Sequence, residues 1–150
     1  MAEPDPRPDP APEPASGPSP RSLAADGRLR DHLAHHLDLV EPGLALYVDP
    51  DGRPGLDYDT PVGPASIVAL DAHDRLVLIE VVTDDAADAG LARLLRCRGW
   101  VRQHLAGGAE VRSVLVVERV TEALRYLLAE VRNVELFSWT VAVAVHRTPV

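Results

Sequence analysis

The sequence predicts an α/β domain, a mixed β-sheet with helices packed on both faces. Two apolar runs, residues 66–70 (SIVAL) and 75–82 (RLVLIEVV), are separated by only four residues, which is typical of a β-hairpin. Residues 111–117 are nearly all apolar, as expected of a central strand covered on both faces. Segments with helical periodicity precede and follow these runs, and this order predicts helices on either side of the sheet.

The remaining elements follow in chain order. Residues 23–39 predict a first helix, because leucines recur every three to four positions and Asp26 stands where a cap belongs. Breaker-rich residues 49–55 predict a turn. The other predicted elements are strands at 44–48 and 56–60, helices at 86–106 (after a polar N-cap, 83–85) and 121–131 (capped by Thr121), and closing strands at 134–137 and 140–145.

Composition divides the 150 residues into a tail and a domain. Residues 1–22 hold eight of the 14 prolines and little apolar surface, so we expect a disordered tail, partly polyproline II, ahead of one domain at 23–150. The tail has no apolar core of the kind a signal peptide needs, and no later run is suited to crossing a membrane. The sequence therefore predicts a cytoplasmic protein without a membrane partner.

Charge limits the chemistry that the chain can perform. The net charge is −8, so any contact with DNA would need a local basic patch. All 15 basic residues are arginines, and arginine cannot replace a lysine amine in proton transfer because its pKa is above about 12. The single cysteine, Cys97, excludes an internal disulfide and argues against a cysteine-based zinc site.

Glu80 interrupts the apolar run VLIEVV and is the residue on which the functional interpretation depends. A carboxylate inside a buried strand costs several kcal/mol unless a cation or metal pairs with it, by about the penalty of an unpaired buried charge. Glu80 is therefore either functional, the remnant of a function, or one half of a structural ion pair.

Several stretches resemble the C-terminal nuclease domain of NucS-type endonucleases. They are Glu41-Pro42-Gly43-Leu44, residues 58–63 (YDTPVG), Ala69-Leu70-Asp71, residues 76–80 (LVLIE), Leu94-Leu95-Arg96 and Gly99-Trp100-Val101, in the family's order and continuing into residues 111–117. The resemblance runs from about residue 29 to residue 145. It implies a restriction-endonuclease-like fold of the PD-(D/E)XK superfamily, whose chemistry uses an acidic Mg²⁺ site.

The resemblance also implies which residues stand at the family's site positions. Glu80 takes the place of the metal-binding glutamate. Ser66 stands where the family has its metal-binding aspartate, Val82 where it has lysine, Arg93 where it has a helix glutamine, and Arg30 falls on or near its first-helix glutamate. One retained ligand binds Mg²⁺ weakly, so the resemblance supports the fold and argues against the activity.

Two interpretations of Glu80 follow. In the first, Arg93 supplies the charge that the missing metal and lysine no longer provide, and forms an ion pair with Glu80. In the second, Glu80 belongs to a rebuilt metal site with Asp59 and Asp57 or Asp71, using Mg²⁺ or Mn²⁺. The small number of metal ligands favours the first interpretation, which expects no cofactor.

Other chemistry-bearing residues have plainer interpretations. Arg93 and Arg96, with Arg98 and Arg102, could follow phosphates along a helix, but in an acidic chain a solvated helix face is favoured. The spacing of His32, His35 and His36 allows metal binding but is nonspecific, and exposed histidines are favoured. The remaining candidates are expected to be packing residues: Trp100, Trp139 and Cys97.

These observations predict a nuclease-fold domain with a degenerate site that binds nucleic acid or a protein partner. A homodimer is implied by the resemblance, since NucS-like proteins pair with one another. The alternative is an active metal-dependent DNA endonuclease built around Glu80.

Overall fold

The structure, a computed structural model, describes residues 27–83, 86–142 and 144–149. The expected mixed sheet is present, with six strands in the order β1-β3-β4-β5-β6, and β2 also pairs with β3. The strands are β1 (Ala45–Leu46), β2 (Leu56–Tyr58), β3 (Ala65–Leu70), β4 (Leu76–Val81), β5 (Arg112–Val117) and β6 (Val134–Ser138). The helices are α2 (Arg28–His35), α3 (Ala87–His104) and α4 (Glu122–Ala129), with a 3-10 turn at Leu37–Leu39.

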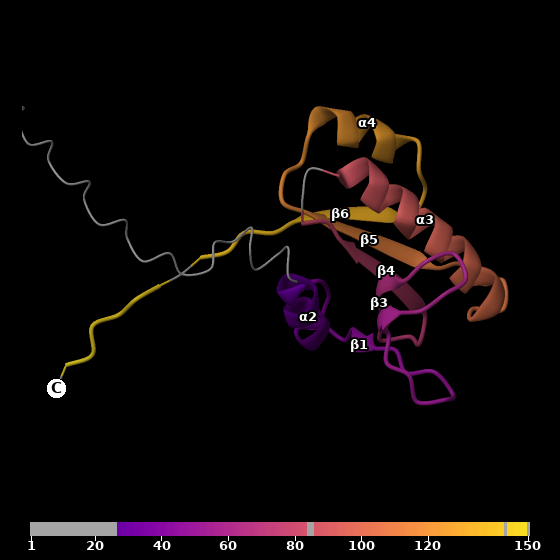
Figure 1. Cartoon of the computed structure of the whole chain (residues 1–150), viewed down its shortest axis with the longest axis horizontal. Coiled ribbons are helices and arrows are strands. Elements are labelled where there is room, and N and C mark those ends of the chain that lie inside the picture. The colour runs from indigo at the N-terminus through magenta and orange to yellow at the C-terminus, as the bar shows by residue number, and fades with distance from the viewer. Residues whose placement is uncertain (1–26, 84–85, 143, 150) are drawn as a thin grey trace, which may run out of the picture.

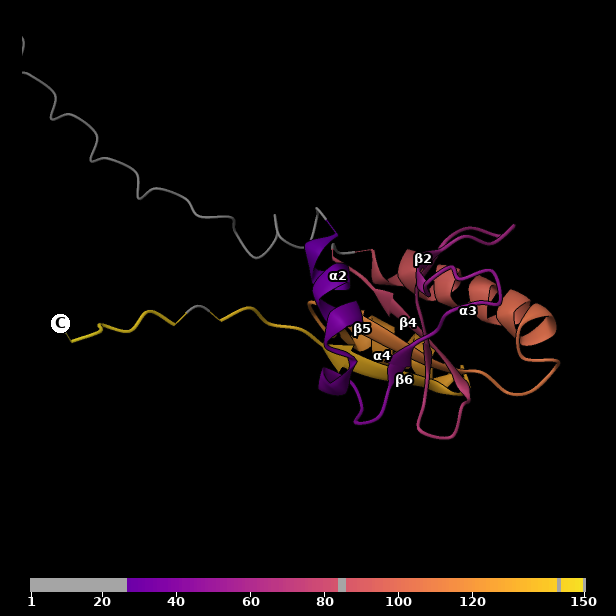
Figure 2. The ribbon, with the colours of Figure 1, turned by 90° about the horizontal axis from the view of Figure 1, so that it is seen from below.

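The pairing follows from the connections. The short turn between β3 and β4 makes them antiparallel, and the crossovers through α3 and α4 make β5 and β6 parallel to the strands before them. Figures 1 and 2 show α2 on one side of the sheet and α3 on the other. The predicted α/β class with helices on both faces is confirmed.

Strand alternation divides the core between the two faces. Val68 and Leu78 point into the cluster beneath α3 and α4, whereas Ile67 and Ile79 point into the cluster beneath α2. Each fully buried side chain of this kind contributes about 1.5–3 kcal/mol. Glu80 lies two residues after Leu78 on β4 and therefore points to the α3 side.

Within the described residues, the helix predicted at 23–39 is divided into α2 (Arg28–His35) and the 3-10 turn at Leu37–Leu39, with a break at His36. Gly27, in the left-handed conformation (φ 73°), precedes α2 as its N-cap residue. The predicted cap Asp26, the helix start at residues 23–26, the Pro-rich tail and the corner residues Asp84 and Asp85 lie outside the described residues. The predicted cap Thr121 is confirmed, since its side chain accepts from the Leu124 N–H at 3.2 Å.

The predicted closing strand at residues 140–145 is wrong. Residues 140–142 and 144–149 form no strand, and Figure 1 shows the chain leaving the sheet after β6. Trp139 fixes this exit, because its backbone N–H bonds the Val117 carbonyl at 2.9 Å and its indole N–H bonds the Val82 carbonyl at 3.2 Å. β5 ends at Val117, so the chain beyond Trp139 has no neighbouring strand there.

Two tight turns are built on the same Asp-x-x-x-Arg pattern. In the β3–β4 turn, Asp71 Oδ1 accepts from the backbone N–H groups of His73 and Arg75 at 2.8 and 3.0 Å, and Oδ2 accepts from the Arg75 guanidinium at 2.9 Å. Asp49 makes the corresponding bonds within residues 49–53. Burial alone would raise the pKa of Asp71, but these hydrogen bonds lower it to about 2.

In the described part of the chain, no helix is long and apolar enough to cross a membrane.

We expect Asp71 to make stability depend on pH. Its folded pKa of about 2 lies below the unfolded value, so its contribution is complete above about pH 4 and is lost as pH falls toward 2. Asp71→Asn should lower the free energy of unfolding at pH 7 by about 1–3 kcal/mol. It should also flatten the loss of stability between pH 4 and 2, measured by urea unfolding. Asp74→Asn is the control, because Asp74 is exposed in the same turn; an equal effect of both variants would contradict this account.

Candidate functional site

The hairpin brings Ser66 and Glu80 together. Because Ile67 pairs with Ile79, the preceding residue of β3 lies opposite the following residue of β4 on the α3 side of the sheet. Ser66 Oγ donates to Glu80 Oε2 at 2.7 Å. Glu80 is only 4% exposed, so both of its carboxylate oxygens need partners within the protein.

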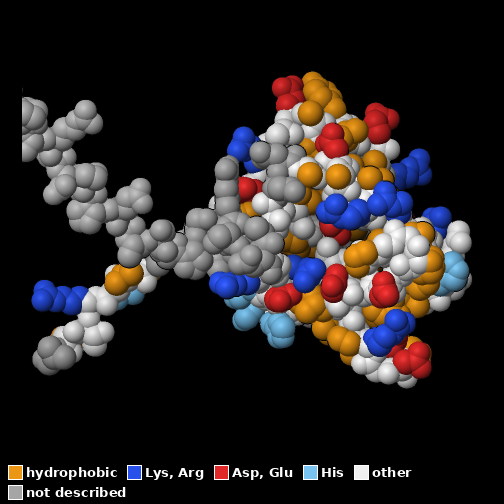
Figure 3. Space-filling view, viewed as in Figure 1, with side chains coloured by type: hydrophobic (Ala, Val, Ile, Leu, Met, Phe, Trp, Pro, Cys, Tyr) orange, Lys and Arg blue, Asp and Glu red, His pale blue; other side chains and the backbone are white. Residues whose placement is uncertain are grey.

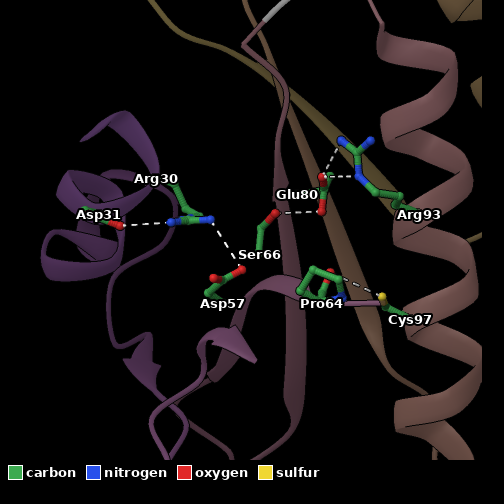
Figure 4. A network of polar contacts seen from close by, with 8 residues as sticks. All are labelled: Arg30, Asp31, Asp57, Pro64, Ser66, Glu80, Arg93 and Cys97. Carbon is green, nitrogen blue, oxygen red and sulfur yellow. Dashed lines mark hydrogen bonds and ion pairs between the residues drawn. The ribbon is translucent and has the colours of Figure 1, made fainter. Parts of the chain in front are cut away.

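Arg93 satisfies the second oxygen of Glu80. Its Nε and Nη2 donate to Glu80 Oε1 at 3.0 and 2.8 Å, from a position two turns into α3 (Figure 4). The ion pair expected from the sequence is therefore present. It is half-buried, because the Glu80 side chain is 5% exposed and that of Arg93 is 42% exposed.

The donor set around Glu80 does not fit a divalent cation. A hard cation needs several oxygen ligands with enough negative charge, and no group of three potential His, Cys, Asp or Glu ligands occurs among the described residues. Both Glu80 oxygens already accept hydrogen bonds, and a guanidinium stands beside one of them. A metal would have to displace Arg93 and overcome its positive charge.

Val82 and α3 occupy the space beyond Glu80 on the same face of β4. Val82 is 2% exposed, and a Cβ at position 90 would overlap its Cγ2, so only glycine at that position lets the helix approach so closely. The position at which the family resemblance implies lysine is therefore packed against helix backbone. This packing holds α3 near Glu80 and places Arg93 within reach of it.

A polar cavity of about 270 Å³ opens in front of the pair. Glu80, Ser66 and Arg93 line one side, and Arg30 of α2 and Asp57 of β2 line the other. Arg30 Nη1 lies 3.4 Å from Asp57 Oδ1, and its Nε is buried without a hydrogen-bond partner among the described residues. Arg30 thus lies at the same cavity as Glu80.

Of the three carboxylates proposed to assist Glu80, the structure brings only Asp57 to the cavity. Asp59 is exposed and is not part of the cavity lining. Asp71 lies at the opposite end of β3 from Ser66 and holds the turn. A site containing Asp71 is therefore ruled out by the strand geometry.

Two of the four arginines of α3 have partners in the structure, and the other two are exposed. Arg98 Nη1 bonds the backbone carbonyls of Arg132 and Asn133 at 2.8 and 3.3 Å, and Arg93 is engaged by Glu80. Arg96 and Arg102 are exposed. Figure 3 shows both basic and acidic side chains on the visible face of the molecule.

The histidines of α2 form no metal site within the described residues. His35 Nδ1 and His36 Nδ1 lie 2.7 and 2.8 Å from the backbone carbonyls of Asp31 and His32, and the rings of His32 and His36 stack at 4.2 Å. Cys97 is buried, as is Trp139, and both pack in the core as expected.

The sequence indicated Ser66, Glu80, Arg93 and Arg30 as site positions and Asp57 as a possible ligand, but it did not predict that Arg30 and Asp57 pair with each other opposite Glu80. These two residues come from α2 and β2, which are distant in the chain. The repeated Asp-x-x-x-Arg spacing at residues 49–53 and 71–75 was a usable signal for turn clamps. It would have removed Asp71 from the candidate metal ligands.

The mixed sheet with helices on both faces is consistent with a restriction-endonuclease-like fold. No protein-family model and no curated protein sequence matches the chain. Among solved structures, the chain is similar to EndoMS in complex with double-stranded DNA, at 17% identity and a TM-score of 0.62, covering 89% of this chain and 49% of that one. It is also similar to a repair endonuclease from Pyrococcus abyssi, at 16% identity and a TM-score of 0.61, covering 76% and 46%.

These likenesses give the chain a NucS-like variant of the restriction-endonuclease-like fold. The chain spans about half the length of either structure. At such low identity the likeness concerns the fold alone.

We expect the Glu80–Arg93 pair to stabilise the domain only while both partners are present. Arg93→Ala should lower the free energy of unfolding by about 1–3 kcal/mol, less than the roughly 3–5 kcal/mol typical of a broken buried pair, because Arg93 is partly exposed. In a Glu80→Gln background, the same change should cost less than about 1 kcal/mol. Urea unfolding of the natural protein, the two single variants and the double variant measures the coupling free energy between the two side chains.

Arg96→Ala is the matched control for this cycle, because Arg96 is exposed one turn further along α3. It should change stability by less than about 0.5 kcal/mol in either background. An Arg93→Ala cost that is the same with Glu80 and with glutamine would show that the two side chains are not coupled.

Proposed function

We propose that this chain is a nuclease-fold module that binds nucleic acid without cutting it. The observation that carries the proposal is the occupation of Glu80: Arg93 and Ser66 engage both carboxylate oxygens. The residue at the position of a metal ligand thus has a guanidinium where a cation would bind. A degenerate site of this kind keeps a folded scaffold and loses the metal.

The remaining groups do not replace the lost chemistry. Phosphodiester hydrolysis in metal-dependent nucleases uses the ion to polarise the phosphate and to lower the pKa of the attacking water. A guanidinium can stabilise phosphate charge, but it neither binds hydroxide as a metal does nor accepts a proton near neutral pH. The sequence has no lysine that could assist, and Val82 stands buried at the corresponding position.

Two observations support nucleic acid as the ligand class. One solved structure with this fold is EndoMS in complex with double-stranded DNA. Arg96 and Arg102 are exposed on α3, the helix that also carries Arg93 at the cavity. Against nucleic acid stands the net charge of −8, which favours a protein partner and makes any DNA binding weak and strongly dependent on salt.

A second function, a metal-dependent DNA endonuclease with a rebuilt site, has one observation in its favour. Asp57 lines the same cavity as Glu80, so two carboxylates face one space. Each of them is paired with an arginine, Asp57 with Arg30 and Glu80 with Arg93. Activity would require Mg²⁺ or Mn²⁺ to displace at least one of these guanidinium groups.

We expect binding of DNA without cleavage. In low salt, fluorescence anisotropy should show binding of single-stranded, duplex or mismatched DNA that persists in EDTA. Gel analysis should show intact DNA with Mg²⁺ or Mn²⁺. Arg96→Ala should weaken binding and reduce the salt dependence by the contribution of about one phosphate contact. Arg125→Ala on α4, also exposed, is the control with the same charge change.

Three results would change this proposal. Absence of DNA binding by the natural protein at low salt would contradict it and direct the search to a protein partner. Metal-dependent cutting that is lost in Glu80→Ala would establish the endonuclease instead. Cutting that appears only in Ser66→Asp/Val82→Lys/Arg93→Gln would support the loss of chemistry at those positions.

A further inference from the structure

Arg30 is poorly paired for an arginine that borders a polar cavity. Its Nη1 lies 3.4 Å from Asp57 Oδ1 and its Nη2 lies 3.5 Å from Asp31 Oδ1, and both carboxylates are more than half exposed. Hydrogen bonds between a guanidinium and a carboxylate are normally about 2.7–2.9 Å long. The third nitrogen, Nε, is buried and has no hydrogen-bond partner within the described residues. Arg30 therefore carries donor groups that the described part of the protein leaves largely unused.

Arg93, on the other wall of the same cavity, also has a nitrogen to spare. Its Nε and Nη2 donate to one oxygen of Glu80 at 3.0 and 2.8 Å, whereas its Nη1 makes no hydrogen bond to the described residues. The side chain of Arg93 is 42% exposed. Figure 4 shows the Arg30 side chain extending from α2 toward Asp57 and Ser66, with Arg93 beyond Glu80. Two guanidinium groups thus border one space of about 270 Å³ with donors available.

The start of α2 adds a further preference for negative charge. Gly27, its N-cap residue, also lines the cavity and has no side-chain oxygen to accept hydrogen bonds from the first N–H groups of the helix. The helix dipole favours an anion at this end. This contribution is secondary to Arg30, because it falls off within the first turn and is screened by salt.

The two carboxylates of the cavity differ in how firmly they are held. Both oxygens of Glu80 already accept hydrogen bonds, from Ser66 and Arg93, and the residue is 4% exposed. Asp57 is 56% exposed and lies 3.4 Å from Arg30, and an exposed ion pair of that length contributes little. An anion with better geometry can therefore replace Asp57 at Arg30, after which the Asp57 carboxylate turns to water.

We propose that this cavity binds a terminal phosphate of a nucleic-acid strand, with Arg30 as the main contact and Arg93 as the second. A phosphate monoester has three free oxygens and nearly two negative charges at neutral pH, so it can use donors on both walls of the cavity. An internal phosphodiester has two free oxygens and one charge, and it satisfies fewer of these donors. The inference rests on the proposed function for the nucleic acid and adds that the chain recognises a strand end.

The first test compares strand ends. An internally labelled single-stranded oligonucleotide should bind the natural chain about 10-fold more tightly with a phosphate at one end than with hydroxyls at both, measured by anisotropy in EDTA and low salt. In Arg30→Gln this preference should fall below about 2-fold, because the guanidinium that holds the phosphate is gone. Arg125→Gln, exposed on α4, removes the same charge and should keep the preference of the natural chain.

The second test uses inorganic phosphate and needs no DNA. Phosphate should raise the midpoint of thermal unfolding of the natural chain relative to sodium chloride at equal ionic strength, because it binds only the folded state. Arg30→Gln should lose the specific part of this shift and Arg125→Gln should keep it, which separates binding from the general effect of phosphate on protein surfaces. Arg30→Gln should unfold cooperatively without phosphate, since the Arg30 side chain is 30% exposed and weakly paired.

The two tests separate this inference from the proposed function. Equal binding of phosphate-ended and hydroxyl-ended strands would overturn the inference and leave nucleic-acid binding in place. An Arg30-dependent phosphate shift in a chain that binds no DNA would remove the proposed function and keep the phosphate site, with a small phosphate ester as its ligand. A shift and an end preference that Arg30→Gln leaves intact would place the site elsewhere and overturn the inference.

Discussion

The buried carboxylate of Glu80 is the constraint on which the arrangement of this domain depends. It lies on a central strand, 4% exposed, where an uncompensated charge would cost several kcal/mol. Arg93 compensates it only if α3 runs close to the end of β4, and glycine at position 90 permits that approach against Val82. The ion pair, the helix position and the packing of the hairpin are therefore one coupled feature.

In the proposed function, the same pair is what lets a nuclease-like scaffold persist without a metal. A guanidinium replaces the positive charge that a metal ion would place beside Glu80, so the electrostatic requirement of the strand is still met. Under the proposed function the metal chemistry is lost, because arginine has no open coordination position and no accessible neutral form. Arg30, paired with Asp57, places a second guanidinium on the opposite wall of the cavity.

The sequence could predict features that depend on local periodicity or on an energetic necessity. The hairpin follows from two apolar runs and a short turn, and the Glu80–Arg93 pair follows from the cost of a buried charge. Features that depend on distant segments were not predictable in this way, such as the ion pair between Arg30 of α2 and Asp57 of β2. The predicted strand at 140–145 failed because alternation specifies a strand's two faces but not a neighbour to pair with.

Helix α2 borders two cavities, the polar cavity at Glu80 and an apolar groove of about 610 Å³ beside β6. Leu29 and Leu33 line the apolar groove, whereas Arg30, about 100° further round the helix, reaches the polar cavity. Because Leu29, Leu33 and Arg30 are carried on the same two turns of α2, any movement of this helix would alter the apolar groove and the polar cavity together.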